Sequence, residues 1–319
     1  MHIDENISDI KVFDFIFKII LMNNKNMSTI AGLVFSSMRP KQWTKNLILF
    51  AALIFSQNVL SPHYLFKTIV AFFIFCIISG CVYLINDLFD LEQDKIHPIK
   101  NKRPLASGAL APSIAIIATV FLLCLSLLCA LLLTNFTFIF IALIYFILQI
   151  AYSTVLKHIV ILDVFSIAAG FVLRALAGAE VIEVPFSTWL LFCAILLSLF
   201  LALSKRRHEL ILLEDDAIHH RKILFEYSPY LLDQMISVVT ASTVITYSLY
   251  TVSEETVSKF GTDRLKYTIP FVLYGIFRYL YLIHQKNEGG SPEKVLLNDL
   301  PLIICIILYG MTVGIILYY

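Results

Sequence analysis

The stretch YLINDLFDLEQDKIHPIKNKRPLASG, residues 83–108, follows a long apolar run and is rich in polar side chains. Asn86, Asp90 and Asp94 recur at every fourth position, and Tyr83 lies three residues before Asn86. An α-helix has about 3.6 residues per turn, so this spacing puts all four side chains on one slowly drifting face. The four side chains share this face if the helix of the apolar run continues through these positions.

This stretch also brings acids and bases close together in the sequence. Asp87 lies beside the polar face, and a cationic cluster follows, made of Lys95, Lys100, Lys102 and Arg103. Proteins hold Mg²⁺ through one or two carboxylates together with phosphate oxygens and water, while Lys and Arg bind anionic oxygens. The pattern therefore predicts a site for a metal-bound pyrophosphate. A solvated helix end followed by topological charges is the simpler alternative.

Composition places the chain in a membrane. Of its 319 residues 59% are hydrophobic and 15% are charged, with a mean hydropathy of +0.84. A soluble domain is about 25% charged, and many runs here approach the roughly 20 apolar residues that cross a bilayer. We expect a polytopic protein whose surroundings are the lipid bilayer. The net charge of +1 gives no reason to expect a nucleic-acid partner, and oligomeric state is left open.

Only helices and closed barrels satisfy backbone groups in lipid, and no strand pattern is visible, so the fold class is all-α. The first of the expected spans is short and could extend back through 29–38. The expected spans are nine helices near 46–60, 68–90, 111–133, 136–156, 160–179, 187–204, 231–251, 268–284 and 300–318. Residues 29–319 are expected to form a single transmembrane domain. Residues 1–28 are expected to be an interfacial helix or a flexible tail.

Positive charge is distributed unequally between the two sides of these spans. Eighteen Lys and Arg fall on the side that holds the N-terminus, four fall on the other side, and two lie within spans. The positive-inside rule then predicts a cytoplasmic N-terminus and an outer C-terminus. The six cysteines lie inside apolar runs without a CxxC pair, so neither a disulfide nor a zinc site is expected.

Other cations stand near helix ends or inside spans. Lys41 and Lys45 share a face, and Lys45, nearer the helix mouth, could reach a phosphate. Lys157 lies in a short connection just before Asp163. Arg174 interrupts a nearly uncharged span, so it should need an anionic partner unless its side chain reaches the outer surface.

The segment SKRRHEL, residues 204–210, puts a compact cation patch at the end of the sixth expected span. Lys205, Arg206 and Arg207 make up this patch. Topology alone would explain such a triplet equally well. A patch of this kind could also hold a phosphate.

The arrangement NDLFDLEQD with nine helices resembles the UbiA superfamily of intramembrane prenyltransferases, whose NDxxDxxxD motif is matched in full. The segments MRPKQWTKN (38–46), HPIKNKRPLASG (97–108), YSTVLKH (152–158) and FVLRALAGA (171–179) are similar to its decaprenyl-phosphate phosphoribosyltransferase branch. The resemblance runs from about residue 35 to the C-terminus. It implies a UbiA-like bundle and a Mg²⁺-dependent transfer of a 5-phosphoribosyl group from phosphoribosyl pyrophosphate to a polyprenyl phosphate.

One departure separates the chain from ordinary members of the superfamily. They carry a second acidic motif, DxxxD, after the sixth helix, where this chain has SKRRHEL. A basic patch suits a monophosphate held without metal. An aromatic prenyltransferase stays open as a rival, although it needs the second acidic motif. A transporter of polyprenyl-linked sugars is a further rival, although no internal repeat supports it.

The resemblance also implies a role for each matching residue. Asp87, Asp90 and Asp94 are expected to be catalytic, and the metal ligands would be Asn86, Asp90 and Asp94. The donor phosphates would be bound by Lys45, Tyr83, Lys100 and Arg103. The lipid phosphate would be bound by Lys157, Arg174, Lys205 and Arg206. Asp163 matches an acid of the branch whose role is open. Such an enzyme would lie in the inner membrane with its active site facing the cytoplasm.

Overall fold

The computed structural model describes residues 29–319 except 99, 214–225, 287–294, 296–297 and 319. In this part of the chain almost every residue is helical and no strand occurs, so the all-α prediction is confirmed. The expectation for residues 1–28 lies outside the described residues.

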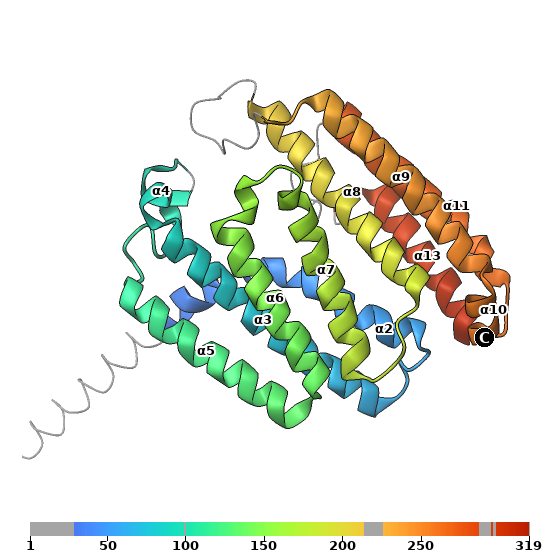
Figure 1. The fold of residues 1–319 in the computed structure, drawn as a ribbon, viewed down its shortest axis with the longest axis horizontal. Coiled ribbons are helices and arrows are strands. Elements are labelled where there is room, and N and C mark those ends of the chain that lie inside the picture. The colour runs from blue at the N-terminus through green and yellow to red at the C-terminus, as the bar shows by residue number, and fades with distance from the viewer. Residues whose placement is uncertain (1–28, 99, 214–225, 287–294, 296–297, 319) are drawn as a thin grey trace, which may run out of the picture. The chain divides into compact units, whose positions relative to one another are not determined.

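Within the described residues, shorter helices lie between the long ones (Figure 1). The long helices are α3 (Pro62–Phe89), α5 (Pro112–Leu133), α6 (Phe136–Thr154), α7 (Leu162–Val181), α8 (Thr188–Leu213), α9 (Pro229–Val252), α11 (Ile269–Gln285) and α13 (Leu300–Tyr318). The short helices are α2 (Phe50–Phe55), α4 (Leu91–Ile96) and α10 (Glu254–Phe260).

Within the described residues, seven helices are long and apolar enough to cross a membrane: α3, α5, α6, α7, α8, α9 and α13. The expected span at 46–60 begins instead in a 3₁₀ helix, Pro40–Leu49, and continues in the six-residue α2. The expected span at 268–284 corresponds to α11, whose 17 residues at about 1.5 Å each fall short of the roughly 30 Å hydrocarbon core. The nine-span count and the cytoplasmic N-terminus stay predictions.

The chain divides into two compact units, which are described separately. Unit 1 comprises Met1–Trp43 and Cys76–Ser126, and unit 2 comprises Thr44–Phe75 and Leu127–Tyr319. The expectation of a single domain for residues 29–319 stays a prediction.

Unit 1 packs its described N-terminal segment against the second half of α3. Its buried core consists of Met38, Leu84, Leu105, Leu110 and Ala115. A Cβ added at Gly80 would lie 2.6 Å from Met38 Cε, so only glycine lets the methionine pack directly on α3.

The polar stretch of unit 1 is not one continuous helix. α3 ends at Phe89, and Asp90 leaves helical geometry with φ −90° and ψ 7° before α4 begins. Two backbone bonds still bridge the break: Asp90 N donates to Asn86 O (2.9 Å) and Asp94 N donates to Asp90 O (2.8 Å). The helix therefore does not run unbroken through Asp94, but backbone hydrogen bonds between residues four apart continue across the break.

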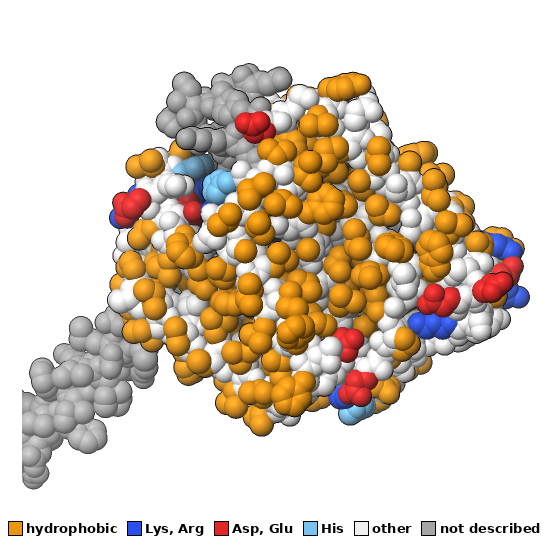
Figure 2. All heavy atoms as spheres, viewed as in Figure 1, with side chains coloured by type: hydrophobic (Ala, Val, Ile, Leu, Met, Phe, Trp, Pro, Cys, Tyr) orange, Lys and Arg blue, Asp and Glu red, His pale blue; other side chains and the backbone are white. Residues whose placement is uncertain are grey.

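In unit 2, α6, α7, α8 and α9 pack in chain order, and α11 packs on α13 (Figure 1). Figure 2 shows hydrophobic side chains spread across the face over α6, α7 and α8. Large exposed hydrophobic side chains include Phe140 and Ile147 on α6, as expected for a surface that faces lipid. The chain is a multi-pass membrane protein.

Candidate functional site

A cluster of carboxylates and cations forms in unit 1 at the end of α3. Asp87 and Asp94 are each 2% exposed. Arg103 pairs with both, with its Nη1 3.1 Å from Asp87 Oδ1 and also against Asp94 Oδ2. Arg39 pairs with the same oxygen of Asp87, and Lys100 Nζ lies 3.9 Å from Asp94 Oδ1. The predicted acids thus lie together with two of the predicted phosphate-binding cations.

The remaining predicted residues of unit 1, Tyr83, Asn86 and Asp90, are more exposed than Asp87 and Asp94. Asn86 Nδ2 donates a hydrogen bond to Asp90 Oδ2 (3.0 Å), and both residues are half-buried. The half-buried ring of Tyr83 lies under Arg39, whose Cζ is 4.7 Å from the ring centroid. The cluster therefore combines buried ion pairs with partly accessible oxygens.

Local sequence explains how Arg103 reaches acids that lie 9 and 16 residues earlier. A short 3₁₀ helix, Lys100–Lys102, precedes it, and Arg103 N donates to Lys100 O (3.0 Å). Gly108 takes a left-handed φ of +77°, which glycine adopts without steric cost. Leu105 and Leu110 are buried in the core of unit 1 and anchor the loop on both sides of this turn.

The acids are not assembled into a ready metal site. Among the described residues, no three Asp, Glu, His or Cys side chains lie close enough together to hold a metal ion. Asp87 and Asp94 face guanidinium groups instead. Because Mg²⁺ in proteins often takes only one or two carboxylates and completes its shell with phosphate and water, Asn86 and Asp90 still suit an ion that binds together with a diphosphate.

Arg174 is buried inside unit 2 among neutral partners. Its Nε donates to Asn46 Oδ1 (2.7 Å), its Nη2 to Tyr145 OH (2.6 Å) and its Nη1 to Gly170 O (3.0 Å). The guanidinium also lies over the rings of Tyr145 and Phe171, at 4.6 and 5.4 Å. With 6% exposure it does not reach toward the outer surface. None of these described contacts is a carboxylate, so the site keeps one positive charge.

Arg206 has the opposite surroundings. Its side chain is 2% exposed and pairs with Asp163 through Nε and with Glu209 through Nη1, while Nη2 donates to Tyr152 OH (3.1 Å). Asp163, which is fully buried, also accepts a hydrogen bond from Tyr227 OH (2.7 Å). The protein itself thus neutralises Arg206, so these contacts favour a role in holding α7 and α8 together.

Tyr227 also supports a strained turn. Its hydroxyl oxygen accepts a hydrogen bond from Ile161 N (2.7 Å), and Ile161 has φ +71°, a conformation that β-branched residues rarely adopt. Burial, together with the hydrogen bond to Asp163, raises the pKa of Tyr227 to about 12.

The other predicted cations of unit 2 lie near the end of α8 or in a neighbouring connection. Lys205 Nζ is 3.9 Å from Glu209 Oε1, and Lys45 lies close enough for its charge to act on Lys205. Lys157 is half-buried in the 3₁₀ turn Leu156–His158. The structure therefore groups Lys45, expected at the donor, with Lys205, expected at the lipid phosphate.

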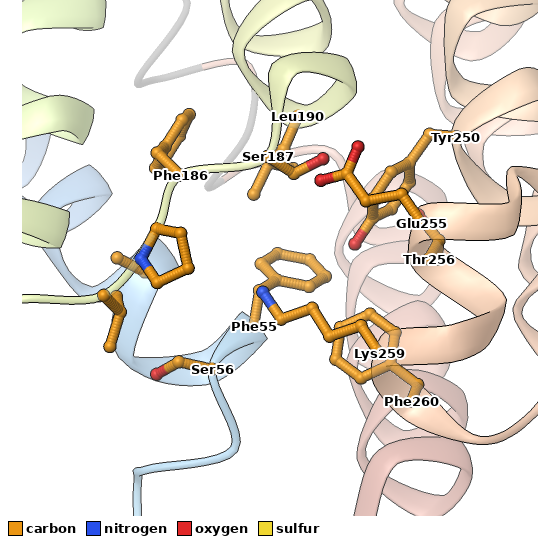
Figure 3. A pocket seen from close by; sticks show the side chains of 13 residues that line it. Phe55, Ser56, Phe186, Ser187, Leu190, Tyr250, Glu255, Thr256, Lys259 and Phe260 are labelled. Atoms are coloured by element: carbon orange, nitrogen blue, oxygen red, sulfur yellow. The ribbon is translucent and has the colours of Figure 1, made fainter.

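A separate pocket lies in unit 2 where α9 and α10 meet (Figure 3). Phe55, Ser187, Tyr250, Glu255 and Lys259 are among its lining residues. Its volume of about 10 Å³ is the room that one water molecule needs. None of the predicted site residues lines it.

The family was decided by comparison with known proteins. The model of the UbiA prenyltransferase family matches residues 46–298. The chain belongs to the UbiA prenyltransferase family. This match confirms the resemblance to the UbiA superfamily, and it also confirms the prediction that the protein is an enzyme.

This UbiA chain has relatives of similar length. It is 33% identical over 301 residues to the decaprenyl-phosphate phosphoribosyltransferase of Mycolicibacterium smegmatis, covering 91% of this chain and 93% of the relative. It is 32% identical over 270 residues to the enzyme of the same name from Corynebacterium glutamicum, covering 82% and 80%.

Solved structures share the fold of this UbiA chain. A UbiA homolog from Archaeoglobus fulgidus bound to GPP and Mg²⁺ matches with a TM-score of 0.67 and 19% identity, over 90% of this chain and 100% of that one. A structure of a digeranylgeranylglyceryl phosphate synthase matches with a TM-score of 0.61 and 20% identity, over 91% and 98%.

Sequence reasoning missed several polar partners in this UbiA chain. It counted Arg39 only as a topological charge and gave no role to Tyr145, Tyr152 or Tyr227. These residues lie 29 to 66 positions from the groups they contact. Periodicity over a few helical turns gives no information about contacts between residues that are so far apart in the sequence. The one available signal was the presence of Tyr145 and Tyr152 inside an expected apolar span.

Proposed function

We propose that the protein transfers a 5-phosphoribosyl group from phosphoribosyl pyrophosphate to a polyprenyl phosphate of decaprenyl type, releases pyrophosphate and depends on Mg²⁺. The reaction would take place at the cytoplasmic face of the inner membrane. The observation that carries this proposal is the cluster of unit 1, in which Lys100 and Arg103, the cations expected to bind phosphate, pair with Asp87 and Asp94 of the NDxxDxxxD motif.

The names of similar proteins support phosphoribosyl pyrophosphate as the donor. Proteins 31–33% identical over most of this chain are named decaprenyl-phosphate phosphoribosyltransferase. In addition, the end of α8 carries Lys205 where ordinary prenyltransferases of the superfamily would have a second acidic motif. A single acidic motif suits one diphosphate, and a cation suits a monophosphate acceptor.

The donor would be held by unit 1. Asn86, Asp90 and Asp94 would ligate Mg²⁺, which when bound neutralises charge on the leaving pyrophosphate. Asp87 would orient the cations around this group. Lys100 and Arg103 would bind phosphate oxygens and stabilise the charge that develops as the bond to ribose C1 breaks.

The acceptor would be held by unit 2. Arg174 offers a buried positive charge with neutral partners, and Lys45, Lys157 and Lys205 offer ammonium groups. A phosphate oxygen of the lipid would attack C1 from the face opposite the leaving group, with inversion. The C1–O bond to pyrophosphate breaks with its electron pair on oxygen. Since the acceptor is already ionised near neutral pH, positioning and electrostatics supply most of the catalysis.

The test uses the full chain purified in detergent. Labelled phosphoribosyl pyrophosphate, polyprenyl phosphate and Mg²⁺ should together put label into the lipid fraction, and omission of any one should prevent this. A parallel reaction receives an isoprenyl diphosphate and an aromatic acid. Prenylation of the aromatic acid without phosphoribosyl transfer would overturn the proposal in favour of an aromatic prenyltransferase.

A further inference from the structure

The backbone of Arg39 has an unusual conformation. Its φ is +54°, in the left-handed region that L-residues other than Asn and Asp seldom occupy. Strain of this kind persists only where surrounding structure holds it, and it concentrates at binding and catalytic sites. The side chain at this position is therefore a candidate for function.

Contacts on both sides fix the turn at Arg39. Met38 is buried and packs on Gly80 of α3, one helical turn before Tyr83. Trp43 Nε1 donates to Met38 O (3.3 Å), and the Trp43 ring meets the edge of Phe35 with centroids 5.5 Å apart. The turn is therefore locked onto the face of α3 that carries the polar cluster.

From this turn the Arg39 side chain reaches along α3. Its guanidinium lies over the Tyr83 ring at 4.7 Å and pairs with Asp87, one turn further on. The side chain is 29% exposed, whereas that of Asp87 is 3% exposed. One edge of the guanidinium is thus held by the protein while part of the group stays accessible.

The contacts at Asp87 leave donor groups for an incoming anion. Arg39, Lys100 and Arg103 pair with the acids of the cluster, Asp87 and Asp94. The third acid, Asp90, accepts a hydrogen bond from Asn86. Arg39 and Arg103 share a single oxygen of Asp87, so each has N–H groups left for another acceptor.

We propose that Arg39 binds the diphosphate end of the donor, with Tyr83 and Asp87 holding its guanidinium in place before the donor arrives. Its planar fork suits two phosphate oxygens, and the Tyr83 ring keeps that plane oriented. This role rests on the proposed function, because it assumes a diphosphate donor at the cluster of unit 1.

The test compares Arg39→Gln, Arg39→Lys and Arg39→Gly with the wild type. Arg39→Gly removes the side chain and suits the left-handed backbone, so it remains informative if Arg39→Gln fails to fold. The matched control is Lys41→Gln, which removes an exposed cation two residues away. The expected result is a rise of about tenfold or more in KM for phosphoribosyl pyrophosphate in Arg39→Gln and Arg39→Gly, as for loss of a hydrogen bond to a charged group.

In Arg39→Lys, KM for phosphoribosyl pyrophosphate should lie between the values of the wild type and Arg39→Gln, because an ammonium keeps the charge but lacks the planar fork of a guanidinium. KM for the polyprenyl phosphate should stay within about twofold in every variant, since the acceptor's reactive end is bound by other residues. Lys41→Gln should behave as the wild type. A fall in kcat and Tm with an unchanged donor KM would overturn the proposal and make Arg39 a structural anchor.

A second readout uses inorganic pyrophosphate with Mg²⁺ as the probe. This pair should raise the Tm of the wild type in detergent and raise it far less in Arg39→Gly. If pyrophosphate protects the wild type but no phosphoribosyl transfer occurs, the proposed function fails while the Arg39 role stands. Equal protection of the wild type and Arg39→Gly would overturn the Arg39 role alone.

Discussion

Arg206 of α8 and Asp163 of α7 form an ion pair in which both side chains are almost completely buried, at 2% and 0% exposure. The two residues stand 43 positions apart in the chain. Glu209 and Tyr152 accept further hydrogen bonds from Arg206, and Tyr227 donates one to Asp163. This pair lies at the place where the sequence alone indicated a cation patch open to a lipid phosphate.

Removing one partner should therefore destabilise the protein. Asp163→Ala leaves the Arg206 guanidinium buried with less compensation, and we expect a loss of about 3–5 kcal/mol in the free energy of unfolding. Thermal unfolding in detergent measures this. The control is Asp233→Ala, which breaks the more exposed pair with Arg207 and should cost about 1 kcal/mol or less. Equal losses would show that the buried pair is no more important than a surface one.

Tyr227→Phe should lower stability at neutral pH by about 1–3 kcal/mol, because Asp163 loses a donor and Ile161 N–H loses its acceptor. The pKa of Tyr227 is raised in the folded protein from its ordinary 10.0 to about 12. Between these values the phenol ionises only in the unfolded state, so the wild type loses the stability that Tyr227 contributes as pH rises, and the Phe variant has no such contribution to lose. The difference in the free energy of unfolding between the wild type and Tyr227→Phe should become smaller above pH 10. A gap independent of pH would contradict this assignment.

Arg174→Met should impair use of the lipid more than use of the donor. Methionine fills much of the volume, but Asn46 Oδ1, Tyr145 OH and Gly170 O lose their donor, so the free energy of unfolding should also fall by about 1–3 kcal/mol. We expect KM for polyprenyl phosphate to rise at least about tenfold while KM for the donor stays within about twofold. Arg264→Gln, an exposed cation elsewhere in unit 2, serves as control. The reverse pattern, with the donor affected, would assign Arg174 to the pyrophosphate.

Asp90→Ala should abolish activity, because the half-buried carboxylate beside Asn86 is the one best placed to meet an incoming Mg²⁺. Initial rates over a Mg²⁺ titration measure the effect. Glu92→Ala removes an exposed acid two residues away, which pairs only at the surface with Lys95, and should leave the rate unchanged. If Asp90→Ala keeps its rate within a few-fold, the metal assignment fails.

Much of the fold could be predicted because membrane helices are encoded by composition over short windows. Apolar runs such as those of α5 and α6 can be predicted to be helices from their composition alone, because a segment in lipid must form its backbone hydrogen bonds internally. The fourfold spacing of Asn86, Asp90 and Asp94 was likewise visible. The helix break at Asp90 does not disturb this spacing, because the backbone hydrogen bonds across the break still join residues four apart.

The partners of the charged residues could not be predicted in the same way. Asp87 meets Arg39, which lies 48 residues earlier, and Arg174 meets Asn46 across 128 residues. The sequence by itself determined most of the membrane helices and the acidic face, because both depend on neighbours within a few helical turns. Only the tertiary structure decided that Arg206 is neutralised by Asp163 whereas Arg174 is not. That difference arises because burial removes water as a partner, so each charge depends on whichever distant side chain the packing brings to it.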